Sequence, residues 1–137
     1  MIYLDTCAAI KLTHVEPETA ELVSWLAARR GTQLVSSALL EVELVRALRR
    51  NEPGALPLVP SVLRRVTRIE IDSEIRKTAA AYPEPLLRSL DAIHLATAQI
   101  LASASGEGLA HFVTYDKRLV SAARAAGLAV AHPGAKY

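Results

Sequence analysis

The segment SLDAIHLATAQILAS, residues 89–103, is apolar on nearly every face when it is drawn as a helix. Its main polar interruptions are Asp91, His94, Thr97 and Gln99. A surface helix keeps one broad polar face, whereas a helix that is apolar on most faces is packed on several sides. We therefore expect residues 89–103 to form a central helix of a folded domain.

Around this helix, short apolar runs alternate with segments of helical periodicity. We expect strands at residues 2–4, 33–36, 68–71, 111–115 and 128–131. We expect helices at residues 6–12, 17–30, 38–50, 89–103 and 119–126, and a further helix capped by Asp72. Residues 56–66 stay undecided because two prolines lie among apolar side chains. The alternation predicts a three-layer α/β fold, in which helices cover both faces of a mostly parallel sheet.

The composition narrows the class of protein. The chain has 137 residues, 51% of them hydrophobic, which suits one domain with a full core. Its 16 Lys and Arg against 14 Asp and Glu leave a charge of +2, which does not by itself indicate nucleic-acid binding. The only cysteine is Cys7, so an internal disulfide is excluded. Because the sequence shows neither a leader pattern nor a membrane-spanning segment, we expect a cytoplasmic protein.

Acidic residues occur at element boundaries and beside apolar stripes, where an unpaired charge is costly. Asp5 and Asp116 follow predicted strands, and Asp91 lies in the first turn of the central helix. On the mid-chain helix, Glu41 and Glu43 flank the apolar stripe on opposite sides, so periodicity cannot choose between them. Each position also has an ordinary explanation, because Asp is common at helix caps, in first helical turns and in solvated turns.

Carboxylates gathered in one cleft repel one another unless they hold protons or a hard cation such as Mg²⁺ or Mn²⁺ neutralises them. Such a site can hydrolyse a phosphodiester without a nucleophilic side chain. Other chemistry is poorly supported, because Cys7 has no His near it in sequence and the four His lack ligand spacing. We expect each His to be structural or exposed. The sequence also contains neither a glycine-rich phosphate loop nor a GxSxG motif.

Four blocks of the sequence form a recognisable pattern. They are MIYLDT at residues 1–6, Glu43 with Arg46 in the mid-chain helix, LDAIHLATA at residues 90–98 and VTYDKRL at residues 113–119. In these blocks and their order, the chain resembles the PIN-domain family, and specifically the VapC-type toxins. The resemblance implies a single PIN-like domain over residues 1–137 and a metal-dependent endoribonuclease that hydrolyses RNA phosphodiester bonds.

The resemblance also implies roles for particular residues. Asp5, Glu43, Asp91 and Asp116 are expected to be the catalytic residues and the ligands of one or two Mg²⁺ or Mn²⁺ ions. The Glu-x-x-Arg spacing of the family favours Glu43 over Glu41. The protein is further expected to be the toxin of a toxin-antitoxin pair, a homodimer restrained by a cognate VapB-like antitoxin.

One position departs from the family pattern, which usually has Ser or Asn two residues after the first Asp. Cys7 stands there and is a weaker hydrogen-bond donor, which leaves the support of Asp5 open. The departure motivates an alternative hypothesis, a catalytically silent PIN-like module that binds protein or RNA. Retention of all four acids argues against it. A receiver domain fits less well, because no paired acids directly follow the first strand.

Several cations lie close in sequence to the acidic positions and are candidates for contacts with RNA phosphates. They are Lys11, Arg46, Lys117 and Arg118. Phosphate contacts of this kind dominate nucleic-acid affinity, although a solvated surface position is the ordinary alternative. For the dimer contacts, we expect exposed apolar residues on the helices around Trp25.

Overall fold

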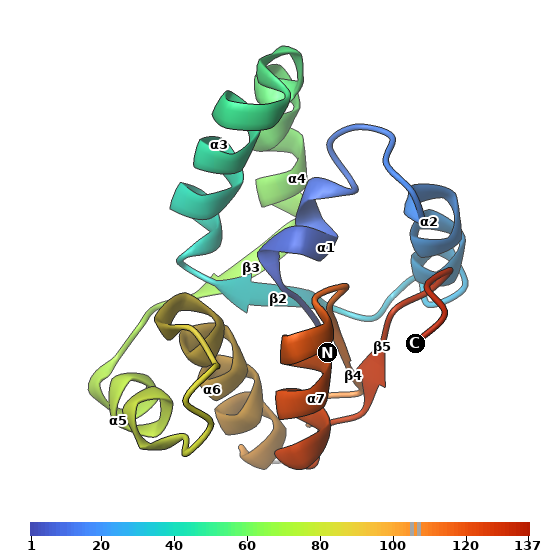
Figure 1. The fold of residues 1–137 in the computed structure, drawn as a ribbon. Coiled ribbons are helices and arrows are strands. Elements are labelled where there is room, and N and C mark those ends of the chain that lie inside the picture. Colours follow the sequence, from blue (N-terminus) through green and yellow to red (C-terminus); the bar gives the residue numbers. More distant parts are fainter. Residues whose placement is uncertain (105, 107) are drawn as a thin grey trace.

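The computed structural model describes residues 1–104, 106 and 108–137 (Figure 1). In this part of the chain, one sheet has the strand order β3-β2-β1-β4-β5, and every adjacent pair is parallel. The strands are β1 (Ile2–Leu4), β2 (Leu34–Ser37), β3 (Val66–Ile69), β4 (His111–Val113) and β5 (Val130–Ala131). The predicted α/β fold with a parallel sheet is confirmed.

Helices cover both faces of this sheet. They are α1 (Thr6–Ile10), α2 (Thr19–Ala27), α3 (Leu40–Asn51), the 3₁₀ segment η1 (Pro53–Leu58), α4 (Val59–Arg65), α5 (Ser73–Ala81), α6 (Ser89–Ser103) and α7 (Lys117–Ala125). Figure 1 shows α1, α3 and α4 on one side of the sheet and α5, α6 and α7 on the other, which gives three layers. No helix in the described ranges is long and apolar enough to cross a bilayer.

The first strand shows how the sequence builds two cores. Because successive side chains of a strand point to opposite faces, Ile2 and Leu4 pack with Leu44 of α3 in one core. Tyr3 points the other way and packs with Leu95 of α6 in the second core. All five side chains are at most 1% exposed. The uninterrupted apolar run before the first Asp therefore reflects a strand that is buried on both faces.

Several element boundaries differ from the sequence prediction, and those of β3 and α2 have a clear physical reason. The third strand begins at Val66, two residues before the predicted range 68–71, because Val66 is buried and pairs with β2. The undecided residues 56–66 lie mostly in η1 and α4, with a proline in the first turn of α4, where a missing N–H costs little. Helix α2 begins at Thr19, two residues later than predicted, because Glu18 before it has a left-handed φ of 68°.

The chain path brings two loops to the same edge of the sheet. From β1 the chain proceeds outward through β2 to β3, and it later returns to β4 on the other side of β1. In parallel α/β sheets, the crevice at such a reversal, beyond the carboxyl ends of the strands, is the usual binding site. Asp5 directly follows β1, and Asp116 lies three residues after the end of β4. The topology therefore brings these two carboxylates together.

Candidate active site

All four predicted acidic residues line one pocket at this edge of the sheet, with a cavity volume of about 280 Å³. Asp5 lies between β1 and α1, Glu43 in the first turn of α3, Asp91 in the first turn of α6, and Asp116 before α7. The lining also includes the polar side chains of Thr6, Cys7, Arg50, Arg88 and His94. A larger hollow of about 440 Å³, lined by apolar and arginine side chains near α2, contains no acidic side chain. The chemistry therefore points to the smaller pocket.

Asp5 is both a helix cap and part of the pocket lining, so its two interpretations are compatible. Its Oδ1 accepts a hydrogen bond of 2.9 Å from the backbone N–H of Ala8, and its Oδ2 accepts one from the hydroxyl of Thr114. The residue is only 4% exposed. Burial raises the pKa of the Asp5 carboxyl, and the hydrogen bonds that it accepts only partly oppose this rise. A cation in the pocket would favour its charged form.

Cys7 donates to Asp5 despite being a weaker donor than the Ser or Asn expected there. Its Sγ lies 3.1 Å from Oδ1 and 3.2 Å from Oδ2 of Asp5. Burial raises the pKa of the Cys7 thiol, and the negative charge of Asp5 raises it further, so the thiol stays protonated and is a poor nucleophile. Thr114, which the sequence analysis did not single out, supplies the stronger hydroxyl donor. The support of Asp5 is therefore shared between two residues.

Glu43, and not Glu41, faces the pocket. Its Oε1 accepts hydrogen bonds from the hydroxyl of Thr6 at 2.8 Å and from Nε2 of His94 at 2.7 Å. Glu41 instead forms an ion pair of 2.9 Å with Arg68 and has a 51% exposed side chain. Burial alone would raise the pKa of Glu43, but its hydrogen bonds and the nearby positive charges outweigh burial and lower it. The flank of α3 that carries Glu43 thus faces the pocket, whereas the flank that carries Glu41 faces solvent and Arg68.

His94 connects the pocket to the core. Its side chain is 2% exposed, and its Nδ1 lies 2.7 Å from the hydroxyl of Tyr3. If the Tyr3 hydroxyl donates to Nδ1, Nε2 carries the hydrogen that is donated to Glu43. From the sequence alone, His94 is expected to be structural or exposed. The burial agrees with a structural position, but the hydrogen bond to a pocket carboxylate was not foreseen.

Arg88 joins the other two carboxylates and was missed by the sequence analysis. Its Nε donates to Asp91 at 3.2 Å, and its Nη2 donates to Asp116 at 3.5 Å. Asp116 also caps α7, because its Oδ1 accepts from the backbone N–H groups of Arg118 at 2.9 Å and Leu119 at 3.1 Å. No sequence signal identified Arg88, since it lies in a proline-containing loop outside every regular element.

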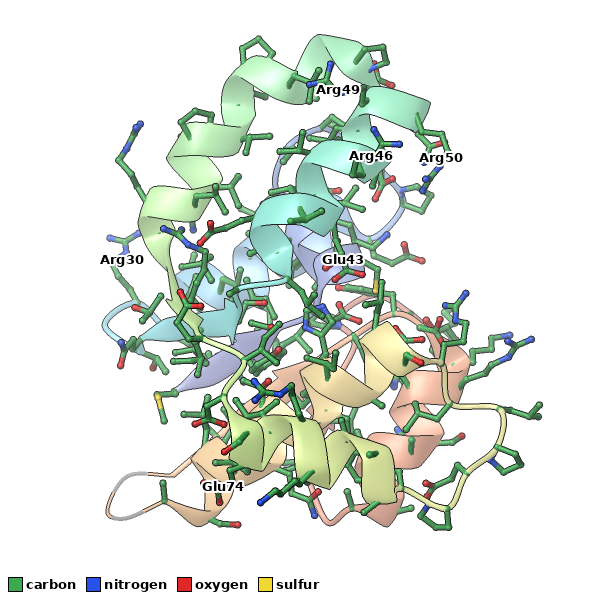
Figure 2. All side chains as sticks on the ribbon, turned by 90° about the vertical axis from the view of Figure 1, so that its left-hand side faces the viewer. Arg30, Glu43, Arg46, Arg49, Arg50 and Glu74 are labelled. Carbon is green, nitrogen blue, oxygen red and sulfur yellow. The ribbon has the colours of Figure 1, made fainter. Side chains whose placement is uncertain are left out.

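The candidate RNA-binding cations have different environments. Lys11 is only 8% exposed, and its Nζ donates to the carbonyl of Pro17 and to Glu18, so its assignment as a phosphate contact was wrong. Arg46, Lys117 and Arg118 are exposed. Figure 2 shows Glu43 at the end of α3 nearest to α6, with Arg46, Arg49 and Arg50 farther along the same helix. Positive charge therefore lies along α3 beside the acidic pocket.

The expected dimer contacts around Trp25 gain little support. Trp25 is half-buried, packs against His111 with ring centroids 5.0 Å apart, and carries the guanidinium of Arg29 at 3.8 Å from its ring. Among the large hydrophobic residues of α2, Val23 is 50% exposed in the described structure. The Trp25 ring therefore already packs against side chains of its own chain.

The donor set of the pocket fits a hard divalent cation. Its acidic side chains offer carboxylate oxygens, which Mg²⁺ and Mn²⁺ prefer, and the raised pKa of buried Asp5 indicates a charge without a strong counter-ion. In the described residues, no three His, Cys, Asp or Glu side chains converge into a complete metal site. The carboxylates must therefore draw closer to bind an ion together.

Comparisons with known proteins identify the family of the chain. The sequence model of the PIN domain matches residues 2–125. Ribonuclease VapC35 of Mycobacterium tuberculosis is 56% identical over 134 residues, which cover 98% of each chain. Ribonuclease VapC47 of the same species is 41% identical over 138 residues, again covering 98% of each chain.

A solved structure also shares the fold. The crystal structure of Mycobacterium tuberculosis VapC20, described as a sarcin-ricin loop cleaving toxin, superposes with a TM-score of 0.68. The match covers 89% of this chain and 95% of that one, at 15% sequence identity. At this identity the likeness shows the fold alone.

Proposed function

This chain belongs to the PIN-domain family as a VapC-type toxin ribonuclease, and we propose that it hydrolyses RNA phosphodiester bonds at Asp5, Glu43, Asp91 and Asp116. The observation that carries this site assignment is that four separate segments bring these carboxylates to one pocket. Because carboxylates gathered in one pocket repel one another, such a gathering favours a cation-dependent function. We also propose that residues 1–137 act as a single PIN-like domain.

VapC-type PIN ribonucleases depend in general on a divalent metal, and we propose Mg²⁺ or Mn²⁺ for this chain. The ligands would be Asp5, Asp91, Asp116 and Glu43. When bound, the ion would neutralise these carboxylates and polarise the scissile phosphodiester. Asp5 is suited to hold it because the N–H of Ala8 and the hydroxyl of Thr114 fix its carboxylate.

Glu43 is suited to present one carboxylate oxygen to the ion. Both of its hydrogen bonds reach Oε1, from Thr6 and His94, and this fixes the direction of Oε2. Because its pKa is lowered, the Glu43 carboxylate is ionised at neutral pH, and Oε2 is the oxygen that would bind the ion. His94 acts as a positioning residue in this proposal, since it touches Glu43.

The RNA would approach along cations that border the pocket. We propose Arg46, Lys117 and Arg118 as phosphate contacts, supported by their exposure and their position near Glu43 and Asp116. Backbone contacts of this kind give affinity without reading bases. The identity of the target RNA would then depend on its shape and on loop geometry.

VapC toxins pair in general with antitoxins. We propose that a cognate VapB-like antitoxin restrains this chain, that the toxin is a homodimer, and that it acts in the cytoplasm. Co-expression with the product of the neighbouring gene tests the first point, because a small protein should then co-purify. Sedimentation of the purified toxin tests the second, with a mass twice that of the chain expected.

Cleavage of total cellular RNA tests the proposed activity. We expect the folded, antitoxin-free protein to give discrete cuts with Mg²⁺ or Mn²⁺ and none with EDTA. Asp91→Asn should abolish the cuts, whereas Asp72→Asn, an exposed helix cap of α5, should retain them. If wild-type protein cuts nothing in any condition, the silent binding module becomes the better hypothesis.

A further inference from the structure

Arg88 lies at the edge of the active-site pocket, in the position just before α6. It donates to Oδ2 of Asp91 at 3.2 Å and to Oδ2 of Asp116 at 3.5 Å. Its side chain is 67% exposed, whereas those of Asp91 and Asp116 are 22% and 30% exposed. Arg88, a long side chain with most of its surface in solvent, thus bridges two half-buried carboxylates at the starts of α6 and α7.

Asp116 has only one carboxylate oxygen that is not used by the backbone of α7. Asp116 uses Oδ1 to cap α7, where it accepts from two backbone N–H groups. Its Oδ2 is therefore the oxygen best placed to bind an ion, and this is the atom that Arg88 engages. Because a guanidinium and a divalent cation repel each other, binding of one to these oxygens disfavours binding of the other.

We propose that Arg88 is a positioning residue that competes with the divalent cation, by holding Asp91 and Asp116 until the ion displaces it. The inference rests on the proposed function, because it requires these carboxylates to bind a cation. In the cation-free state, Arg88 keeps the two acidic side chains together and reduces their repulsion. On binding, the carboxylates exchange the guanidinium for the ion. The affinity for the ion is then lower than the same acids would have without Arg88.

Metal binding, measured by calorimetry with Mn²⁺ on the full chain, tests this competition. Arg88→Gln should lower the dissociation constant by about tenfold, the change expected when two partly exposed ion pairs no longer have to be broken. Arg50→Gln is the matched control, because Arg50 lines the same pocket without an ion pair to a carboxylate in the described structure. It should change the constant by less than about twofold. Arg88→Lys should give an intermediate value, because a point charge replaces the guanidinium fork.

The outcomes separate this inference from the proposed function. Equal effects of Arg88→Gln and Arg50→Gln would show a general effect of charge and overturn the competition. Absence of Mn²⁺ binding in wild type and in every variant would overturn the metal-dependent function itself.

A spectroscopic readout follows the displacement directly. The Nε–H resonance of Arg88, identified by its loss in Arg88→Gln, should shift when Mg²⁺ saturates the wild-type protein. The corresponding resonance of Arg29, which stacks on Trp25 away from the pocket, should stay in place. If the Arg88 resonance is unchanged at saturation, the guanidinium keeps its partners and the competition is refuted.

Discussion

Asp5→Asn should stabilise the cation-free protein while abolishing cleavage. The carboxylate of Asp5 is 4% exposed, and its raised pKa means that burial outweighs the hydrogen bonds it accepts. Desolvating an ion costs several kcal/mol, and although each hydrogen bond to a charged acceptor returns about 1.5–3 kcal/mol, the raised pKa indicates that burial outweighs these bonds at Asp5. Asparagine keeps the volume and the acceptor for Ala8, so the net gain should be about 1 kcal/mol.

The gain should depend on pH in a defined direction. An acid whose pKa is raised in the folded state contributes stability that is present below its unfolded pKa and is lost as pH rises through its folded pKa. Wild-type protein loses this contribution on going to neutral pH, whereas Asp5→Asn does not titrate. The difference in unfolding free energy between the two proteins should therefore be smallest at about pH 3.5 and largest above the raised pKa of Asp5.

Urea denaturation in EDTA at a series of pH values measures this difference. Asp72→Asn is the matched control, because Asp72 also caps a helix through a 2.9 Å bond, from the N–H of Ile75, but is exposed. Its change in unfolding free energy should stay within about 0.5 kcal/mol. A loss of stability in Asp5→Asn at neutral pH, or an equal gain in Asp72→Asn, would refute the reasoning from buried charge.

Three further predictions concern the surroundings of the site. Tyr3→Phe removes the hydroxyl bonded to buried His94, so it should destabilise the protein by about 1–3 kcal/mol in urea denaturation, and an unchanged midpoint would contradict this. Arg46→Ala should weaken RNA binding in a cleavage-inactive background and reduce the slope of affinity against salt by about 1, whereas an unchanged slope would exclude a phosphate contact. Cys7 should react with iodoacetamide much more slowly than free cysteine at about pH 8, because burial and Asp5 raise its pKa, and a normal rate would contradict this.

Much of the fold was predictable because its signals are local. The apolar run Ile2–Leu4, the cap at Asp72 and the helix over residues 89–103 depend on periodicity and on neighbouring residues. The start of β3 was not predictable, because it depends on the pairing of Val66 with β2, a contact between segments distant in sequence. Residues 56–66 were undecided because prolines are compatible with both a loop and a first helical turn.

The site was only partly predictable from the residues themselves. Periodicity places Glu41 and Glu43 symmetrically about the apolar stripe, and the choice between them came from resemblance to a family. Lys11 was misassigned because its partners depend on how the loop after α1 folds back. The bridge made by Arg88 joins residues 28 positions apart and has no local pattern.

Single-turnover cleavage of one mapped RNA, by the four variants Asp5→Asn, Glu43→Gln, Asp91→Asn and Asp116→Asn, tests the central assignment most directly. Glu41→Gln is the matched control, because Glu41 lies two residues from Glu43 and pairs with Arg68 outside the pocket. We expect each of the four variants to lose at least about 100-fold in rate, and the control to stay within about twofold of wild type. A near-normal rate in any of the four, or an equal loss in Glu41→Gln, would contradict the proposed site.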